Sequence, residues 1–189
     1  HVALALSNLD LREHLRLQSV RDPLTDLYNR RFMEEFFESE LKRSRRGGYP
    51  VGLIMFDIDR FKEFNDTNGH TAADYLLKEL GQYLRNSLRG EDVVCRYGGD
   101  EFIIILPGAS LEDTLRRSEQ IRREVYQLRM VQYGKEMPGV TISMGVACSP
   151  EHGSTRDEMM RSVDLALYQA KKNGRNCVAV AQSECWAMV

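Results

Sequence analysis

The chain has 189 residues, of which 42% are hydrophobic and 29% are charged, a composition that is ordinary for a single globular domain. Its formal net charge of -2 lacks the basic surplus needed to bind polymeric DNA or RNA, so no nucleic-acid partner is expected. No apolar run approaches the roughly 20 residues of a membrane span, so we expect a cytoplasmic domain without membrane contact of its own, although the full-length protein could be membrane-anchored.

The N-terminal segment is rich in leucine and charged residues and predicts a helix over residues 1–20. Asp22-Pro23 ends that pattern, because proline drives the preceding residue out of the helical region. The chain starts at His1 rather than Met, so we expect a fragment of a larger protein. The predicted organisation is a helical linker over 1–20, one folded domain over 21–181 and a tail over 182–189.

Helical and strand patterns alternate along the rest of the chain. Amphipathic spacing predicts helices over 29–47, 71–88, 111–128 and 157–172, with Asn29 and Thr71 as N-caps of the first two. Apolar runs predict strands over 51–56, 93–97, 102–106, 140–147 and 177–180. This order predicts an α/β sandwich in which helices pack on a mixed central sheet. The four cysteines are widely spaced and predict buried, reduced thiols.

Acidic residues gather at the predicted ends of two strands. Gly98-Gly99 permits a sharp hairpin turn that presents Asp100 and Glu101, although an ordinary solvated hairpin tip has the same residues. Asp57 and Asp59 leave a buried strand, where a charge needs a partner. Such carboxylates, completed by phosphate oxygens, suit Mg²⁺ or Mn²⁺ better than Zn²⁺. The pattern therefore indicates a phosphoryl-transfer site with two metal ions.

Several motifs then follow one another in a fixed order. They are DPLTDLYNR at 22–30, FDIDRFKEFND at 56–66, RYGGDEF at 96–102, TISMGVA at 141–147 and AKKNGRN at 170–176. Together they resemble GGDEF-domain diguanylate cyclases over about residues 21–181. The resemblance implies a ferredoxin-like core similar to nucleotide cyclases and polymerase palms. It also implies an enzyme that condenses two GTP molecules into cyclic di-GMP and releases two pyrophosphates.

The resemblance also implies roles at the metal site. Asp57, Asp100 and the main-chain carbonyl of Ile58 would hold the metals, although the Ile58 side chain also suits the core. Asp100 or Glu101 would help to deprotonate the attacking 3′-hydroxyl. Lys62 would steady the phosphates and the transition state.

Further residues match the substrate positions of the family. Asn65 and Asp74 match its guanine readers, and a carboxylate can accept the N1-H and amino protons that adenine lacks on that edge. This favours GTP over ATP. His70 falls on a substrate position but also suits an ordinary loop residue. Lys171 and Arg175 match ligands of the triphosphate.

Arg89 and Asp92 match the RxxD product-inhibition site of many family members, in which arginine can fork onto guanine or phosphate. The family site also uses an arginine from the following helix, where this chain has Gln120. Inhibition by cyclic di-GMP is therefore expected, but weaker than the pair alone suggests. Neighbouring arginines that could replace the missing one are Arg116, Arg117, Arg122 and Arg123.

The resemblance further implies a homodimer in which each domain binds one GTP and the two sites face each other. The segment 1–20 would couple this pairing to an upstream sensory domain. A different class of function also fits, a non-catalytic receptor that binds cyclic di-GMP through Arg89 and Asp92. The same fold would suit an enzyme that makes a mixed cyclic dinucleotide and, more distantly, a polymerase palm.

Overall fold

A computed structural model describes residues 20–132 and 134–182, so the predicted linker and tail lie almost wholly outside the described residues. A six-stranded sheet has the order β1-β3-β4-β2-β7-β8. Central β2 is antiparallel to β4 and β7, and β3 is antiparallel to β4. The two edge strands are parallel to their neighbours, β1 to β3 and β8 to β7. The strands are β1 (Tyr28–Asn29), β2 (Val51–Ile58), β3 (Val93–Gly98), β4 (Glu101–Pro107), β7 (Ile142–Ser149) and β8 (Val178–Val180).

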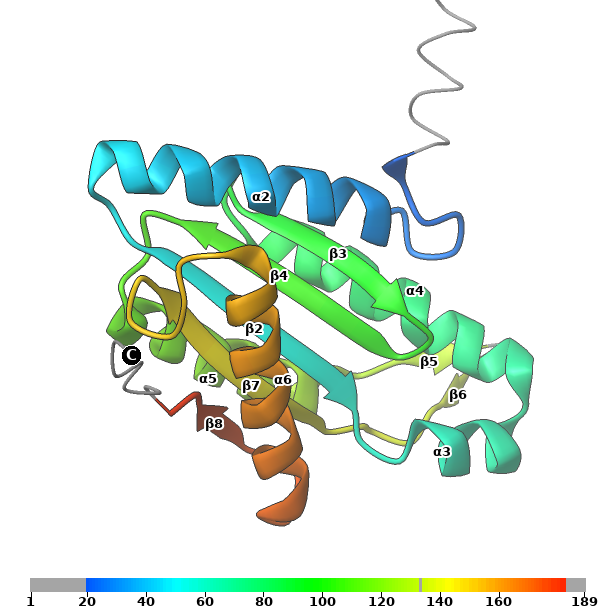
Figure 1. Cartoon of the computed structure of the whole chain (residues 1–189). Coiled ribbons are helices and arrows are strands. Elements are labelled where there is room, and N and C mark those ends of the chain that lie inside the picture. Colours follow the sequence, from blue (N-terminus) through cyan, green and yellow to red (C-terminus); the bar gives the residue numbers. More distant parts are fainter. Residues whose placement is uncertain (1–19, 133, 183–189) are drawn as a thin grey trace, which may run out of the picture.

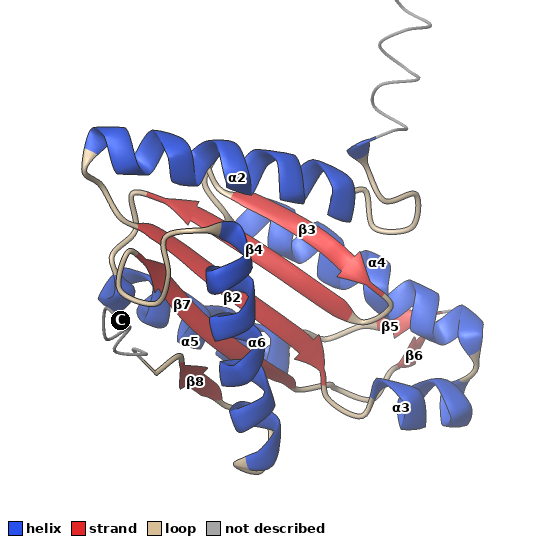
Figure 2. Ribbon diagram, in the orientation of Figure 1, coloured by secondary structure: helices blue, strands red, loops and turns tan. Residues whose placement is uncertain are grey.

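Helices cover both faces of this sheet (Figure 1 and Figure 2). Helices α4 (His70–Ser87) and α5 (Leu111–Gln127) lie on one face, and α2 (Arg30–Gly47) and α6 (Arg156–Lys172) lie on the other. Strands β2, β3, β4 and β7, with α4 and α5 between them, form the β-α-β-β-α-β order of a ferredoxin-like fold. The predicted fold class is confirmed.

Alternation along the strands divides the core into two layers. In β2, Ile54 and Phe56 face α4 and α5, whereas Leu53 and Met55 face α2 and α6. The Phe56 ring stacks on Phe102 of β4 with centroids 5.1 Å apart. Because both faces of β2 are buried, its run of apolar residues is continuous, and the charged Asp57 follows only where the strand ends.

Local sequence signals set three of the helix starts. Asn29 accepts a hydrogen bond from the Phe32 amide and caps α2, and Ser110 caps α5. Thr155 and Glu158 form a reciprocal capping box on α6. Each side chain satisfies an amide that has no partner within its own helix.

Some local predictions were wrong or incomplete. Helix α4 begins at His70 after Gly69, which has no side-chain cap, so Thr71 is not the N-cap. Strand β1, helix α3 (Phe61–Asn68) and the β5–β6 ribbon (Val131–Gln132 and Lys135–Glu136) were not predicted. These elements are too short for a periodic apolar pattern to emerge.

In the described part of the chain, no helix is long and apolar enough to cross a membrane. Cys95 and Cys148 are buried free thiols, and Cys177 is a half-buried one. Cys185 lies outside the described residues. Burial raises the pKa of the Cys95 thiol to about 12 and that of Cys148 to about 11, so both are unreactive at neutral pH.

Candidate active site

Two carboxylates meet where β2 and β4 lie side by side. Asp57 of β2 is directly opposite Glu101 of β4, and the Ile58 amide donates to the Asp100 carbonyl at 3.4 Å. Directly opposed like charges destabilise a strand pair. The arrangement therefore calls for a cation at this edge of the sheet.

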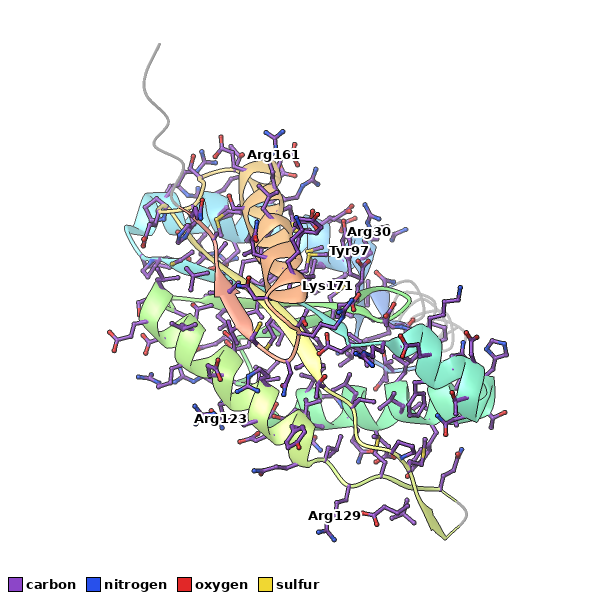
Figure 3. The ribbon with its side chains drawn as sticks, turned by 90° about the horizontal axis from the view of Figure 1, so that it is seen from below. Arg30, Tyr97, Arg123, Arg129, Arg161 and Lys171 are labelled. Atoms are coloured by element: carbon purple, nitrogen blue, oxygen red, sulfur yellow. The ribbon has the colours of Figure 1, made fainter. Side chains whose placement is uncertain are left out.

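A lysine supplies a positive charge in this structure. Lys171, near the C-terminal end of α6 (Figure 3), places its Nζ 2.9 Å from Oδ2 of Asp57, whose side chain is 15% exposed. Burial raises the pKa of Asp57, the charges of Asp100 and Glu101 raise it further, and Lys171 opposes both effects. The ammonium group thus occupies a position at which a metal ion would be stabilised.

A metal ion at this edge would need ligands besides the protein side chains. Within residues 20–132 and 134–182, no three Asp, Glu, His or Cys side chains lie close enough to hold a metal ion unaided. The Ile58 side chain is fully buried in the core, so Ile58 can contribute only its carbonyl. Mg²⁺ commonly uses one or two carboxylates and completes its shell with phosphate oxygens and water. Asp57 and Asp100 fit that pattern, but only together with a bound nucleotide.

Asp59 does not belong to this acidic group, contrary to the grouping made from the sequence. Its carboxylate accepts hydrogen bonds from the Thr141 and Ser143 hydroxyls, both at 2.6 Å, and from the Asn176 amide at 3.0 Å. Asp59 therefore fixes the end of β2 to β7 and to the turn after α6. No local pattern could have predicted this role, because the partners lie more than 80 positions away.

The hairpin between β3 and β4 ends in Gly98-Gly99. Gly99 has a φ of 50°, in the left-handed region that glycine tolerates, and the strand register shifts between Arg96 and Gly98. A Cβ added at either glycine would meet nothing within 4 Å. The tip of the hairpin therefore faces open space, where a ligand can approach.

Residues expected to read the nucleotide lie on α3 and α4. The Gly69 amide donates to the Asn65 carbonyl at 2.8 Å and ends α3 just before α4 begins. Lys62, His70 and Asp74 are exposed. The Asn65 Oδ1 atom is the only buried side-chain polar atom without a hydrogen-bond partner among the described residues. A buried acceptor of this kind calls for a donor from a ligand or water.

Arg175 lies in the turn after α6. Arg175 and Asn176 both have positive φ, at 66° and 45°, and the Arg175 amide donates to the Ala170 carbonyl at 3.2 Å. The Asn176 bond to Asp59 holds this turn against the end of β2. The exposed Arg175 side chain therefore starts from the same edge of the sheet as Asp57.

The RxxD residues line a separate cavity. The Arg89 amide donates to Oδ2 of Asp92 at 3.0 Å, and burial raises the pKa of Asp92. The cavity has a volume of about 310 Å³, and Arg116, Arg117 and Gln120 also line it. It reaches Pro107, at the opposite end of β4 from the Gly98-Gly99 hairpin.

The arginines near position 120 divide into two groups. Arg117 donates to Oε1 of Gln120 at 3.1 Å and lines the cavity together with Arg116. Arg122 instead pairs with Glu119 and Asn176, and Arg123 lies near Glu119; neither lines the cavity. Of these four, only the first two are placed to contact a ligand there.

The domain is a ferredoxin-like α/β protein whose strand ends carry carboxylates beside a lysine and an exposed glycine hairpin, which is an arrangement that suits metal-assisted phosphoryl transfer. Residues 19–177 match the family described as diguanylate cyclase, GGDEF domain, and the chain belongs to this family. The recognition made from the motifs is confirmed.

Named relatives agree with this assignment. The chain is 43% identical over 173 residues to the response regulator PleD of Caulobacter vibrioides, in a match that covers 91% of this chain and 37% of the relative. It is 40% identical over 157 residues to the diguanylate cyclase DosC of Escherichia coli, in a match that covers 83% of this chain and 34% of DosC. The chain thus spans little more than a third of the length of these curated relatives.

Solved structures have the same fold. The GGDEF domain of DgcB from Caulobacter crescentus, in complex with c-di-GMP, has a TM-score of 0.81 and 30% identity and covers 87% of this chain and 94% of its own. Diguanylate cyclase SiaD from Pseudomonas aeruginosa, in complex with its activator SiaC, has a TM-score of 0.82 and 36% identity. The match covers 95% of this chain and 68% of the SiaD chain.

Proposed function

We propose that this domain is a diguanylate cyclase that joins two GTP molecules into cyclic di-GMP and releases two pyrophosphates. The observation that carries the proposal is the opposed pair Asp57 and Glu101, with Asp100 beside them and Lys171 bound to Asp57. Named diguanylate cyclases at 40% identity support the same reaction.

Asp57, Asp100 and the Ile58 carbonyl would hold Mg²⁺ or Mn²⁺, two ions per site once the phosphates of GTP are bound. When bound, the metals lower the pKa of the 3′-hydroxyl and neutralise charge that builds on the α-phosphate. Asp100 and Glu101 lie at the exposed hairpin, where a carboxylate can take the proton of that hydroxyl.

The basic residues would orient the triphosphate. Lys62 from α3 and Arg175 from the turn after α6 would bind the phosphates, and both side chains are exposed. Lys171, whose Nζ lies 2.9 Å from Oδ2 of Asp57, would also bind the phosphate oxygens of GTP. These contacts keep the α-phosphate in line with the attacking hydroxyl.

Asn65 and Asp74 would read guanine between α3 and α4. The buried Oδ1 of Asn65 can accept a hydrogen bond from the base, and the exposed Asp74 carboxylate can accept hydrogen bonds from N1-H and the exocyclic amine. Adenine offers no such donor at N1, so this pair favours GTP. His70, at the start of α4, lies one helical turn before Asp74 and is a further candidate contact.

Each domain would contribute one GTP, so catalysis requires a homodimer with the two sites facing each other. The rate per domain should then fall on dilution. An upstream sensory domain, joined through 1–20, would regulate the pairing. A rate per domain that stays constant on dilution argues against this part of the proposal.

Cyclic di-GMP would inhibit the enzyme by binding the cavity at Arg89 and Asp92. Arg116 or Arg117 takes the place of an arginine at position 120. Arg89→Ala should abolish inhibition by added product without lowering the initial rate, because the cavity lies at the other end of β4. Unchanged initial rates of the unmodified domain with added micromolar product would count against the site.

The decisive experiment is incubation of the domain at high concentration with GTP, ATP or both in the presence of Mg²⁺, followed by chromatography. Cyclic di-GMP from GTP alone is expected, and Asp100→Asn should remove it. A mixed cyclic dinucleotide would instead indicate weaker base selection by Asn65 and Asp74. Asp157→Asn is the matched control, because that aspartate pairs with Arg156 at the start of α6, at the other end of the helix from Lys171, and does not line the RxxD cavity.

The rival is a receptor that binds cyclic di-GMP at the RxxD cavity without turnover. Tight binding of cyclic di-GMP with no product, even when the domains are joined by a fused dimerising helix, would favour the receptor. Intact carboxylates at Asp57, Asp100 and Glu101 support the enzyme instead.

A further inference from the structure

The turn that enters the domain is closed by Asp22. Its carboxylate accepts hydrogen bonds from the Thr25 amide at 2.8 Å and the Thr25 hydroxyl at 2.7 Å. The Asp22 amide donates to the Leu27 carbonyl at 2.8 Å. Backbone and side chain together therefore hold the turn rigid.

Arg96 of β3 connects this turn to the catalytic hairpin. Its guanidinium lies 3.2 and 3.3 Å from the two carboxylate oxygens of Asp22, and its Nε donates to the Gly99 carbonyl at 2.9 Å. The Arg96 and Asp22 side chains are only 15% and 19% exposed, so solvent screens this ion pair less than the surface pairs. One side chain thus bridges the entering segment and the residue just before Asp100.

The hairpin needs such a support. The strand register is interrupted between Arg96 and Gly98, and glycine is the residue with the most conformational freedom to lose. Without a fixed Gly99 carbonyl, the adjacent peptide could rotate and carry Asp100 away from Asp57. A misplacement of about 1 Å in a catalytic group can lower a rate by as much as roughly a hundredfold.

The first turn of α2 makes a second contact with the same strand. The Arg30 guanidinium lies 4.4 Å from the centre of the Tyr97 ring (Figure 3). This contact holds the Tyr97 side chain but does not involve the Gly98-Gly99 turn. Arg96, by contrast, bonds directly to the main chain of the glycine turn.

We propose that Arg96 is a positioning residue for the reaction: clamped by Asp22, it fixes the Gly99 carbonyl so that Asp100 and Glu101 face Asp57. The segment that enters at residue 20 is thereby coupled to the metal-binding hairpin. The inference rests on the proposed function of the site, and it assigns to the entering turn a role in the chemistry.

The test removes the negative charge of Asp22 while it leaves the hydrogen bonds of the turn in place. Asp22→Asn keeps an oxygen that can accept from Thr25, but it removes the carboxylate that holds Arg96. Asp26→Asn is the matched control, because Asp26 lies in the same turn and pairs with Arg85 of α4, away from the hairpin. Arg96→Lys keeps a positive charge near Asp22 but cannot bind Asp22 and Gly99 through one planar group.

Asp22→Asn and Arg96→Lys should each lower kcat roughly tenfold, with little change in the KM for GTP, because the base-reading residues lie on other elements. Both should also raise the Mn²⁺ concentration needed for half-occupancy severalfold. This concentration is measured by electron paramagnetic resonance in the presence of 3′-deoxy-GTP, which lacks the attacking hydroxyl. Asp26→Asn should change neither quantity.

Hydrogen exchange of the Asp100 and Glu101 amides gives a direct readout of hairpin order that does not depend on turnover. Exchange should accelerate in Asp22→Asn and Arg96→Lys at temperatures where circular dichroism shows a folded domain. Exchange, Mn²⁺ affinity and kcat equal to those of Asp26→Asn would overturn the inference. A domain that makes no cyclic di-GMP refutes the proposed function instead, and the exchange and Mn²⁺ arms still test the coupling.

Discussion

Helix α6 packs main chain against main chain on the sheet at Gly145 of β7, and Gly145→Ala tests how much depends on this contact. An added Cβ would lie 2.3 Å from the Val163 carbonyl oxygen and 2.5 Å from the Leu167 amide nitrogen, both main-chain atoms of α6. Ordinary contacts begin near 3.4 Å, so the helix must retreat by about 1 Å. Main-chain atoms of a packed helix cannot rotate away as a side-chain end can.

The expected cost follows from that distance. Overpacking a core costs about 1–3 kcal/mol, and a gap of about 1 Å forfeits up to half of the contact energy of the atoms that separate. We expect a loss of about 3 kcal/mol, which lowers Tm by roughly 10 °C for a domain of this size. Because α6 also carries Lys171, affinity for GTP should fall as well.

Urea unfolding, followed by circular dichroism, measures the free energy of unfolding. Binding of a fluorescent GTP analogue measures the affinity of the site for GTP. Gly139→Ala is the matched control, because a Cβ there meets nothing within 4 Å and the backbone has no positive φ. An unfolding free energy for Gly145→Ala within about 0.5 kcal/mol of that for Gly139→Ala, the range of neutral surface changes, would refute this reasoning.

Three further outcomes can be measured. Thr155→Ala removes the capping box of α6 and should cost about 1 kcal/mol in urea unfolding, whereas Thr155→Ser should cost much less. Burial by itself would raise the pKa of Asp22, but the hydrogen bonds from Thr25 and the charge of Arg96 outweigh it and hold the folded pKa below its ordinary value. The contribution of Asp22 to stability is therefore present above the unfolded pKa and is lost as pH falls through the folded one, so the stability gap between the domain and Asp22→Asn should begin to shrink as the pH falls to the ordinary aspartate pKa of about 3.9 and should shrink further below it. Brief alkylation at pH 8 followed by peptide mapping should leave Cys95 and Cys148 unmodified until the domain unfolds, and rapid native labelling of either would contradict their burial.

The sequence alone determined the family, the fold class and most of the long elements. Apolar runs predicted β2, β4 and β7, because strands buried on both faces carry few polar residues. Amphipathic spacing likewise predicted α2, α4, α5 and α6. The Gly98-Gly99 turn with its two following acids pointed to the site, because these residues are adjacent in the chain and their chemistry is evident locally.

Only the tertiary structure decided which distant residues meet. It separated Asp57, which faces Glu101 and Lys171, from Asp59, which holds strand ends together, although a single residue stands between the two aspartates. Asp59 follows the last residue of β2, so strand alternation no longer sets its direction, and its partners come from elements far along the chain. The contact of Arg96 with Asp22 likewise spans 74 positions, and no local pattern encodes a pairing that forms only when the sheet assembles.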